Sequence, residues 1–211
     1  MPLLFLTVSA QDRTAGVFDE AGVKGLPVFR YNIFRSLTDT EGKFILNIHA
    51  EIPNDRLQFL KKDSVYEASY TISSAVFREG DTDGIPLHQR SESKKLTVRD
   101  YKKTQSVRPE FHHNFKFEAV NGGYSVVLSV KDNNTKKTHT VRRQVEFQDE
   151  SDIIISDIRM VYWTDDSDFE NTYHELISNV VDKQSDYTGA LFEIFSTGSK
   201  YRDFSLRYRI V

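Results

Sequence analysis

Residues 44–52 read FILNIHAEI, and this stretch places an apolar side chain at every second position. The apolar set is Phe44, Leu46, Ile48, Ala50 and Ile52. The intervening polar set includes Asn47, His49 and Glu51. A period of two predicts a β-strand with one face buried and the other in water, as antiparallel sheets allow.

The same alternation extends in both directions along the chain. It recurs at residues 28–33, 66–77, 124–130 and 138–147, with Gly-, Asn- and Asp-containing turns between the segments. Residues 87–98 alternate less cleanly and are rich in Lys and Arg, which is typical of an edge strand. About seven strands with turns at short intervals indicate an all-β immunoglobulin-like or fibronectin-like sandwich, although the Cys-Trp-Cys core of true immunoglobulin domains is missing.

The chain divides into four predicted segments. Residues 1–10 are read as a signal-peptide remnant and residues 11–26 as a polar lead-in. Residues 27–149 form the first sandwich module, and residues 150–211 form part of a second. We therefore expect tandem β-sandwich modules, of which the second is incomplete.

A weak internal repeat supports the tandem arrangement. The sequence at 31–34, YNIF, resembles FEIF at 192–195, and FILNI at 44–48 resembles FSLRY at 204–208. The two pairs have nearly equal spacing, which favours duplication of one β module.

The N-terminus predicts export. Residues 3–8 form the apolar run LLFLTV, and the following Ser9-Ala10 resembles a signal-peptidase site. An edge strand or a disordered terminus is the alternative. We expect a periplasmic, outer-envelope or extracellular protein, and no segment is long and apolar enough to be a membrane span.

Composition restricts the function classes. The chain has 211 residues, a net charge of −3 and no Cys, and its basic and acidic residues are interspersed. We therefore expect no nucleic-acid partner, because duplex binding needs a basic footprint. The lack of Cys also excludes a disulfide framework and a thiol nucleophile within these residues.

Clusters of ionisable side chains are weak candidates for a site. His112 and His113 are adjacent, so in a strand they point to opposite faces and only one can join a given metal site. We expect surface or rim histidines, with metal binding as the alternative. The acidic groups at 79–83 and 165–170 are expected to be solvated loops, with calcium binding as the alternative.

No catalytic motif is present. The chain lacks a G-x-S-x-G elbow and a phosphate-binding Gly loop, so we predict a protein that is not an enzyme, with no catalytic residue, cofactor or metal. Seven phenylalanines at strand spacing are predicted core residues: Phe29, Phe34, Phe44, Phe59, Phe111, Phe115 and Phe117. Tyr162 and Trp163 are a candidate ligand platform, or alternatively the seal of an interdomain joint.

Several short motifs resemble bacterial GWxTD domain-containing proteins. The main one is the strand of residues 44–52 ending in Ile52-Pro53-x-x-x-Leu57-x-Phe59, and shorter likenesses occur at 66–70, 104–106, 156–158, 192–194 and 206–210. The naming Gly-Trp-x-Thr-Asp motif is missing, since residues 162–165 read YWTD without the Gly or the spacer. The resemblance implies an exported bacterial protein with β-sandwich modules ahead of a C-terminal domain, and it assigns no residue a catalytic role.

The sequence thus predicts a non-catalytic exported module that scaffolds or mediates protein contacts in a bacterial cell envelope. A carbohydrate-binding module is one alternative, and it predicts an exposed row of aromatic residues around Tyr162 and Trp163. An accessory domain of an envelope hydrolase, with its catalytic part downstream, is the other.

Overall fold

The computed structural model describes residues 25–38, 40, 42–80, 84–147, 153–163, 174–177 and 187–196. These residues are predominantly β-strand, as the alternation predicts, with one short α-helix and one 3-10 turn. The predicted signal remnant, most of the lead-in, the acidic group at 165–170 and the repeat block at 204–208 lie outside the described residues. No helix in the described ranges is long and apolar enough to cross a membrane.

The first sheet contains three antiparallel strands in the order β1-β2-β6. They span Arg30–Leu37 (β1), Lys43–Pro53 (β2) and Pro109–Val120 (β6). Ile48 pairs with Ile33 on one side and Phe115 on the other, so the stretch at 44–52 is the central strand. The predicted apolar set of this strand is buried.

The second sheet is built around β4 (Val65–Arg78) and β7 (Gly122–Asp132). Strand β5 (His88–Val98) lies along one side of β4, while β7 lies along the other and pairs in turn with β8 (Thr138–Phe147). The short β3 (Leu60–Lys62) pairs with β4 beyond the end of β7. The polar strand predicted at an edge, β5, does lie at an edge.

Strand order identifies the sandwich as immunoglobulin-like. The sheet β1-β2-β6 corresponds to strands A-B-E of an immunoglobulin domain. The other sheet, in the order β5-β4-β7-β8, corresponds to strands C′-C-F-G. The tyrosine corner of such folds is also present, because the Tyr124 hydroxyl donates to the Val120 carbonyl at 2.6 Å and accepts from the Val120 amide at 3.1 Å. The predicted all-β sandwich class is confirmed.

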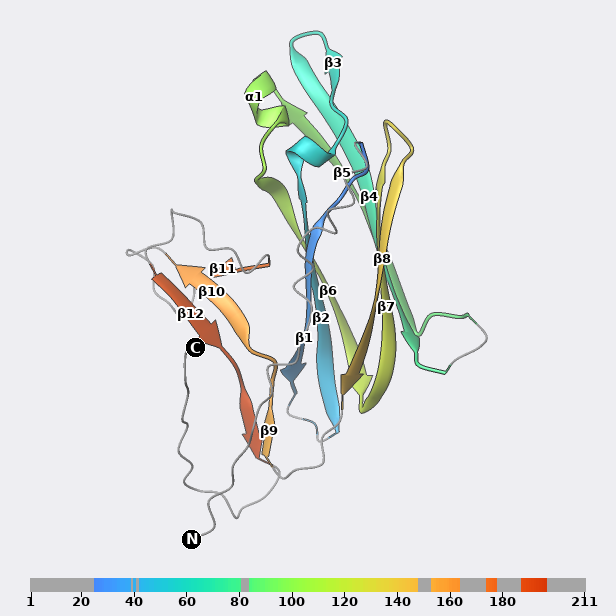
Figure 1. The fold of residues 1–211 in the computed structure, drawn as a ribbon, viewed down its shortest axis with the longest axis vertical. Helices are drawn as coiled ribbons and strands as arrows, with labels where there is room; N and C mark the ends of the chain where they lie inside the picture. Colours follow the sequence, from blue (N-terminus) through green and yellow to red (C-terminus); the bar gives the residue numbers. More distant parts are fainter. Residues whose placement is uncertain are drawn as a thin grey trace.

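The core lies between the two sheets (Figure 1). Leu46, Ile48, Ile72, Leu128 and Val130 are each fully buried. Burial of one such aliphatic side chain stabilises the fold by about 1.5–3 kcal/mol. Of the predicted core phenylalanines, all but Phe34 belong to this core or pack against it.

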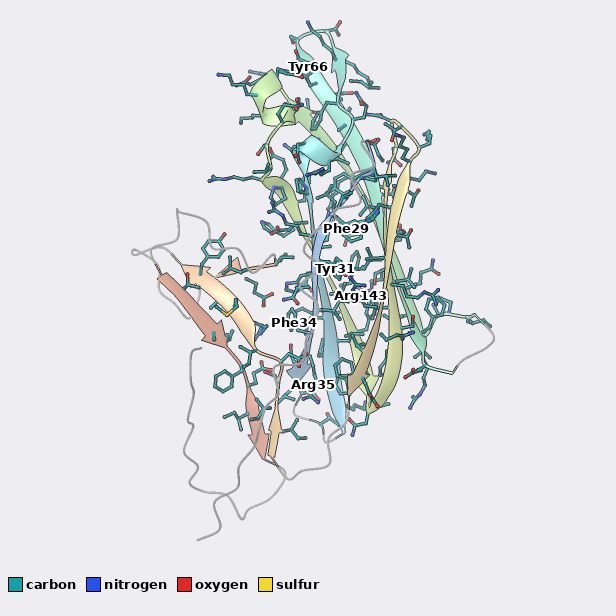
Figure 2. All side chains as sticks on the ribbon, viewed as in Figure 1. Phe29, Tyr31, Phe34, Arg35, Tyr66 and Arg143 are labelled. Atoms are coloured by element: carbon teal, nitrogen blue, oxygen red, sulfur yellow. The ribbon has the colours of Figure 1, made fainter. Side chains whose placement is uncertain are left out.

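Long and aromatic side chains close both open sides of the sandwich. On the β1–β8 side, Phe29 packs edge-on against His139, and the Arg143 guanidinium lies 5.7 Å from the Tyr31 ring centroid (Figure 2). On the β5–β6 side, the His88 ring stacks on Phe117 with centroids 5.0 Å apart. These contacts shield the core where the strands of the two sheets do not pair.

A smaller β unit follows the sandwich and lies beside the β1–β2–β6 sheet (Figure 1). Its strands are β9 (Ile153–Ile155), β10 (Arg159–Trp163), β11 (His174–Glu175), β12 (Tyr187–Leu191) and β13 (Ile194–Ser196). β10 pairs with β12, and β9 with β13, in nearly continuous register. His174 and Glu175 pair with β10 as a short strand.

Candidate functional site

The edge of strand β1 forms the joint between the sandwich and the smaller β unit. The amide of Arg35 donates to Oδ2 of Asp157 at 2.7 Å, and the amide of Asp157 donates to the carbonyl of Arg35 at 3.2 Å. Asp157 therefore occupies the edge position where a neighbouring strand would pair. The loop between β9 and β10 covers an edge that would otherwise be open to pairing with another chain.

Two further groups extend this joint. The Arg35 guanidinium donates through Nη2 to the Ile155 carbonyl at 2.7 Å and lies 5.9 Å from the Phe147 ring centroid. The Leu37 amide donates to Oε2 of Glu193 at 2.9 Å. Glu193 is held in turn by Ser156, whose hydroxyl accepts from the Glu193 amide at 2.7 Å.

A second cluster lies on the outer face of the β1–β2 sheet. Phe34 is buried there and not in the sandwich core, because the Arg159 guanidinium covers its ring at 5.3 Å and His49 packs edge-on at 4.9 Å. This corrects the expectation that Phe34 is a core residue and that the polar face of residues 44–52 is in water. Asn47 and Glu51 on that face are also buried.

Glu175 links the two units electrostatically. Its Oε1 accepts from Nη1 of Arg159 at 2.9 Å, and its Oε2 lies against Nδ1 of His49. Burial acts to raise the pKa of Glu175, but the contacts with His49 and Arg159 together outweigh it, and the pKa lies below its usual value. The carboxylate is therefore held in its charged form at neutral pH.

The predicted platform residues lie on β10, which also contributes Arg159 to the joint. Tyr162 is half-buried and pairs with Thr188 of β12, while the side chain of Trp163 lies outside the described residues. Ile158 and Met160 are exposed at two-residue spacing from Tyr162. The aromatic platform remains a prediction.

A separate cluster of loops lies at the end of the sandwich where β2 ends. Here the β2–β4 connection contains the 3-10 turn η1 (Asn54–Arg56), and the β5–β6 connection contains the helix α1 (Tyr101–Thr104). Asn54 donates to the Lys103 carbonyl at 3.0 Å, and the Asp55 amide donates to the Ser106 carbonyl at 3.1 Å. The two connections are therefore fixed to each other.

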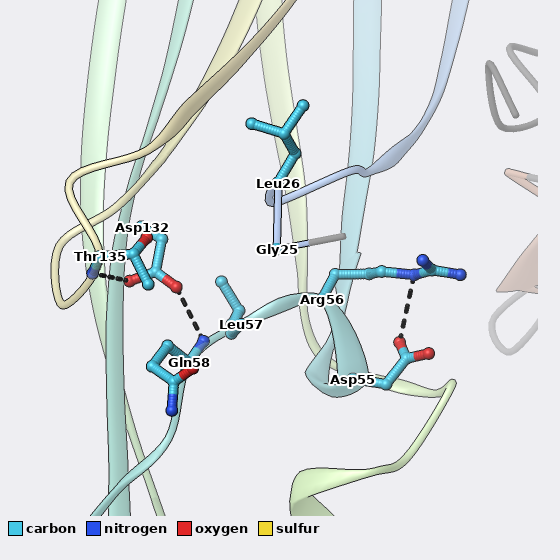
Figure 3. Close-up of a pocket in the computed structure, with 8 residues that line it drawn as sticks. All are labelled: Gly25, Leu26, Asp55, Arg56, Leu57, Gln58, Asp132 and Thr135. Carbon is cyan, nitrogen blue, oxygen red and sulfur yellow. Dashed lines mark hydrogen bonds and ion pairs between the residues drawn. The ribbon is translucent and has the colours of Figure 1, made fainter. Parts of the chain in front are cut away.

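Buried Asp132 attaches the β7–β8 turn to the same loops. Its carboxylate accepts backbone amides of Gln58 at 2.7 Å, Asn134 at 2.7 Å and Thr135 at 3.1 Å. A small polar cavity of about 130 Å³ lies here, and it is lined by Asp132, Gln58 and Thr135 together with Gly25, Leu26, Asp55, Arg56 and Leu57 (Figure 3). Both carboxylate oxygens of Asp132 are engaged in holding the loops, so the cavity has a structural explanation.

The adjacent histidines differ in environment, as strand alternation predicts. His112 is exposed, and its Nδ1 lies 2.7 Å from Oε1 of Glu51, whose hydrogen bond raises the pKa of His112. His113 is buried, which corrects the expectation of a surface or rim residue. Its Nε2 lies 2.7 Å from the Tyr70 hydroxyl and its Nδ1 lies 3.2 Å from Oε2 of Glu92.

Burial dominates the electrostatics of this Tyr70–His113–Glu92 chain. It lowers the pKa of His113 although Glu92 acts in the opposite sense, and it raises the pKa of Tyr70 well above the usual value. The Tyr70–His113–Glu92 contacts connect the two sheets, because these residues lie on β4, β6 and β5. The alternation of apolar and polar residues does not predict these contacts. Among the described residues, no group of three or more His, Asp and Glu side chains is placed to hold a metal ion.

No protein-family model matches the chain, and no curated protein matches it.

Proposed function

We propose that this chain is a non-catalytic, exported β-sandwich protein that scaffolds or mediates protein contacts in a bacterial cell envelope. The observation that supports the proposal best is the joint, in which Asp157 exchanges two hydrogen bonds with the edge of β1. A scaffold must hold its surfaces in a defined relation, and edge pairing restricts both translation and rotation between two β units.

Charge across the joint supports the same proposal. Three carboxylates of the smaller unit face the sandwich. Asp157 and Glu193 accept the β1 amides of Arg35 and Leu37, and Glu175 lies against the His49 ring. Asp157 and Glu175 are partly buried, and a partly buried carboxylate that loses its partner is destabilising, so separation of the two units is disfavoured. The orientation is then fixed by specific polar contacts and not by apolar burial alone.

Capture of partners from a cell-envelope extract tests this proposal. The immobilised full chain is expected to retain the same partner reproducibly, and Asp157→Ala is expected to weaken that capture while leaving the sandwich folded by circular dichroism. The exposed Asp55→Ala serves as the matched control. Failure of the wild-type chain to retain any partner, or equal capture by Asp157→Ala, would contradict the proposal.

A carbohydrate-binding module is the second candidate. In this alternative, the half-buried Tyr162 on β10 supplies the aromatic face for a sugar. Sugars pack on aromatic faces, so this alternative predicts specific signals on a glycan array. Loss of those signals in Trp163→Ala would replace the scaffold proposal with sugar recognition.

A further inference from the structure

The loops at the β2 end of the sandwich carry a concentrated positive charge. We define the loop end as residues 54–64, 99–108 and 133–137, which contain nine basic and three acidic residues, a formal charge of +6. The basic residues are Arg56, Lys61, Lys62, Arg99, Lys102, Lys103, Arg108, Lys136 and Lys137, and all are exposed. The whole chain has a net charge of −3, so this charge is local.

Two of the three acidic residues in the loop end have a local partner. Asp55 pairs with the neighbouring Arg56 at 3.6 Å, and Asp100 accepts the Lys102 amide as the N-cap of α1. Outside the loop end, Glu67 of β4 pairs with Lys62 at 2.7 Å. Most of the lysine charge therefore faces solvent at one end of the molecule.

Large apolar side chains are exposed among these lysines. Tyr101 and Val107 are each 59% exposed and Leu60 is 45% exposed. Tyr101 also packs against Tyr66, with ring centroids 5.6 Å apart, which orients it on the surface. Hydrogen bonds join the three connections that carry these residues, and the connections lie at one common end of the sandwich (Figure 1).

The joint lies toward the opposite end of the sandwich. Arg30 at the start of β1 pairs with Glu51 near the loop end, whereas the joint residues Arg35 and Leu37 pair with Leu46 and Phe44 near the opposite end. The smaller β unit is therefore attached away from the lysines. Within the described residues, the loop end is open to a partner while the joint stays closed.

The kind of basic residue indicates the partner. Six of the nine basic residues are Lys, which is a strongly hydrated point charge and is depleted from protein–protein interfaces. Lysine clusters are attracted to anionic lipid surfaces without a fixed geometry, and aromatic side chains favour the interfacial region of a bilayer. An acidic protein surface would instead favour Arg.

We infer that the loop end binds the surface of an anionic phospholipid bilayer, with its lysines at the headgroups and Tyr101, Val107 and Leu60 in the interfacial region. This goes beyond the proposed scaffold function, which concerns protein contacts. Bilayer binding attaches the molecule at the loop end, while the joint fixes the orientation of the smaller β unit relative to the sandwich.

Vesicle co-sedimentation of the full chain tests the inference. Binding is expected to vesicles of phosphatidylcholine with phosphatidylglycerol, to weaken as salt is raised, and to be lost with pure phosphatidylcholine. The double substitution Lys102→Gln and Lys103→Gln is expected to lower the partition coefficient about 25-fold, because each lysine contributes a factor of about five. The control pair Lys43→Gln with Lys116→Gln, on the β2–β6 sheet, should change it less than about twofold.

A second measurement reports on the apolar side chains. The chain has one Trp, so Tyr101→Trp in a Trp163→Phe background gives a single reporter, whose emission should shift to the blue on anionic vesicles. Tyr101→Ser should lower the partition coefficient with an unchanged circular dichroism spectrum. Equal binding to neutral vesicles, full binding by the Lys102–Lys103 variant, or binding to polyglutamate without binding to vesicles would each overturn the inference.

Discussion

The main chain of Arg35 and the side chain and amide of Asp157 are joined by two hydrogen bonds, although 122 positions separate the residues in sequence. One carboxylate thus completes the pairing of an edge strand and attaches a second β unit to the sandwich. The arrangement combines protection of a sheet edge with control of interdomain orientation.

Substitution of Asp157 by Ala should loosen the joint. It leaves the Arg35 amide without its acceptor, which costs about 1–3 kcal/mol of joint stability. Spin labels on β2 and β12 should then give a broader distance distribution by pulsed electron paramagnetic resonance. Asp55→Ala, which removes an exposed carboxylate, should leave the distribution as it is in the wild type. A distribution unchanged in Asp157→Ala would show that other contacts fix the orientation.

Removal of the tyrosine corner should destabilise the sandwich. Tyr124→Phe deletes the hydroxyl that contacts both backbone groups of Val120, with an expected loss of about 1–2 kcal/mol. Urea unfolding measures the change as a shift in midpoint at constant slope. Tyr101→Phe removes an exposed hydroxyl and should shift the midpoint by less than about 0.5 kcal/mol. An equal shift in both variants would contradict the assignment.

Truncation in the core should have a much larger effect than the same truncation at the surface. Leu128 is fully buried between the sheets, so Leu128→Ala is expected to cost about 2–5 kcal/mol. Leu60→Ala, at a residue 45% exposed, should stay within about 0.5 kcal/mol of the wild type. Thermal and urea unfolding compare the two. Similar losses would mean that Leu128 is not part of the core.

Acidification should destabilise the fold through His113. Burial lowers its pKa in the folded chain, so below a pH of about 6.5 the unfolded chain binds the extra proton and the folded chain resists it. The free energy of unfolding should therefore fall as the pH falls from about 6.5 toward the lowered pKa. His113→Asn should reduce this dependence, as measured by urea unfolding between pH 7 and pH 5. An unchanged dependence would show that His113 titrates equally in both states.

The neighbouring His112 should act with the opposite sign. Its hydrogen bond to Glu51 raises its pKa, so its stabilising effect is fully present below its unfolded pKa of about 6.5 and is lost as the pH rises through the raised value. His112→Gln should remove a contribution that declines on going from acid to neutral pH. Nuclear magnetic resonance titration of both imidazoles would check the order directly. A pKa of His113 above that of His112 would refute both predictions.

Much of the sandwich follows from local pattern. The alternation at 44–52 and 124–130 identifies the inward faces, and Asn121-Gly122-Gly123 lies where β6 meets β7. The polar strand 88–98 lies at an edge because its side chains do not suit burial on both faces. Such features depend on residues a few positions apart, so the sequence records them.

The sites depend on residues far apart. Phe34 has the same strand spacing as the core phenylalanines, yet it is buried in the joint, because Arg159 and His49 cover its ring on the outer face of the sheet. Likewise, nothing near His113 in sequence indicates Tyr70 or Glu92, which approach it from two other strands.

The sequence by itself determined the strand class, the inward faces and the turns, since a period of two reports which side of each strand avoids water. The tertiary structure alone decided which outward polar residues become buried, which carboxylates replace a strand at the β1 edge, and which lysines gather at one end. The physical reason is that burial and charge pairing are properties of the assembled surfaces, and the local period of a strand carries no information about what covers its outer face.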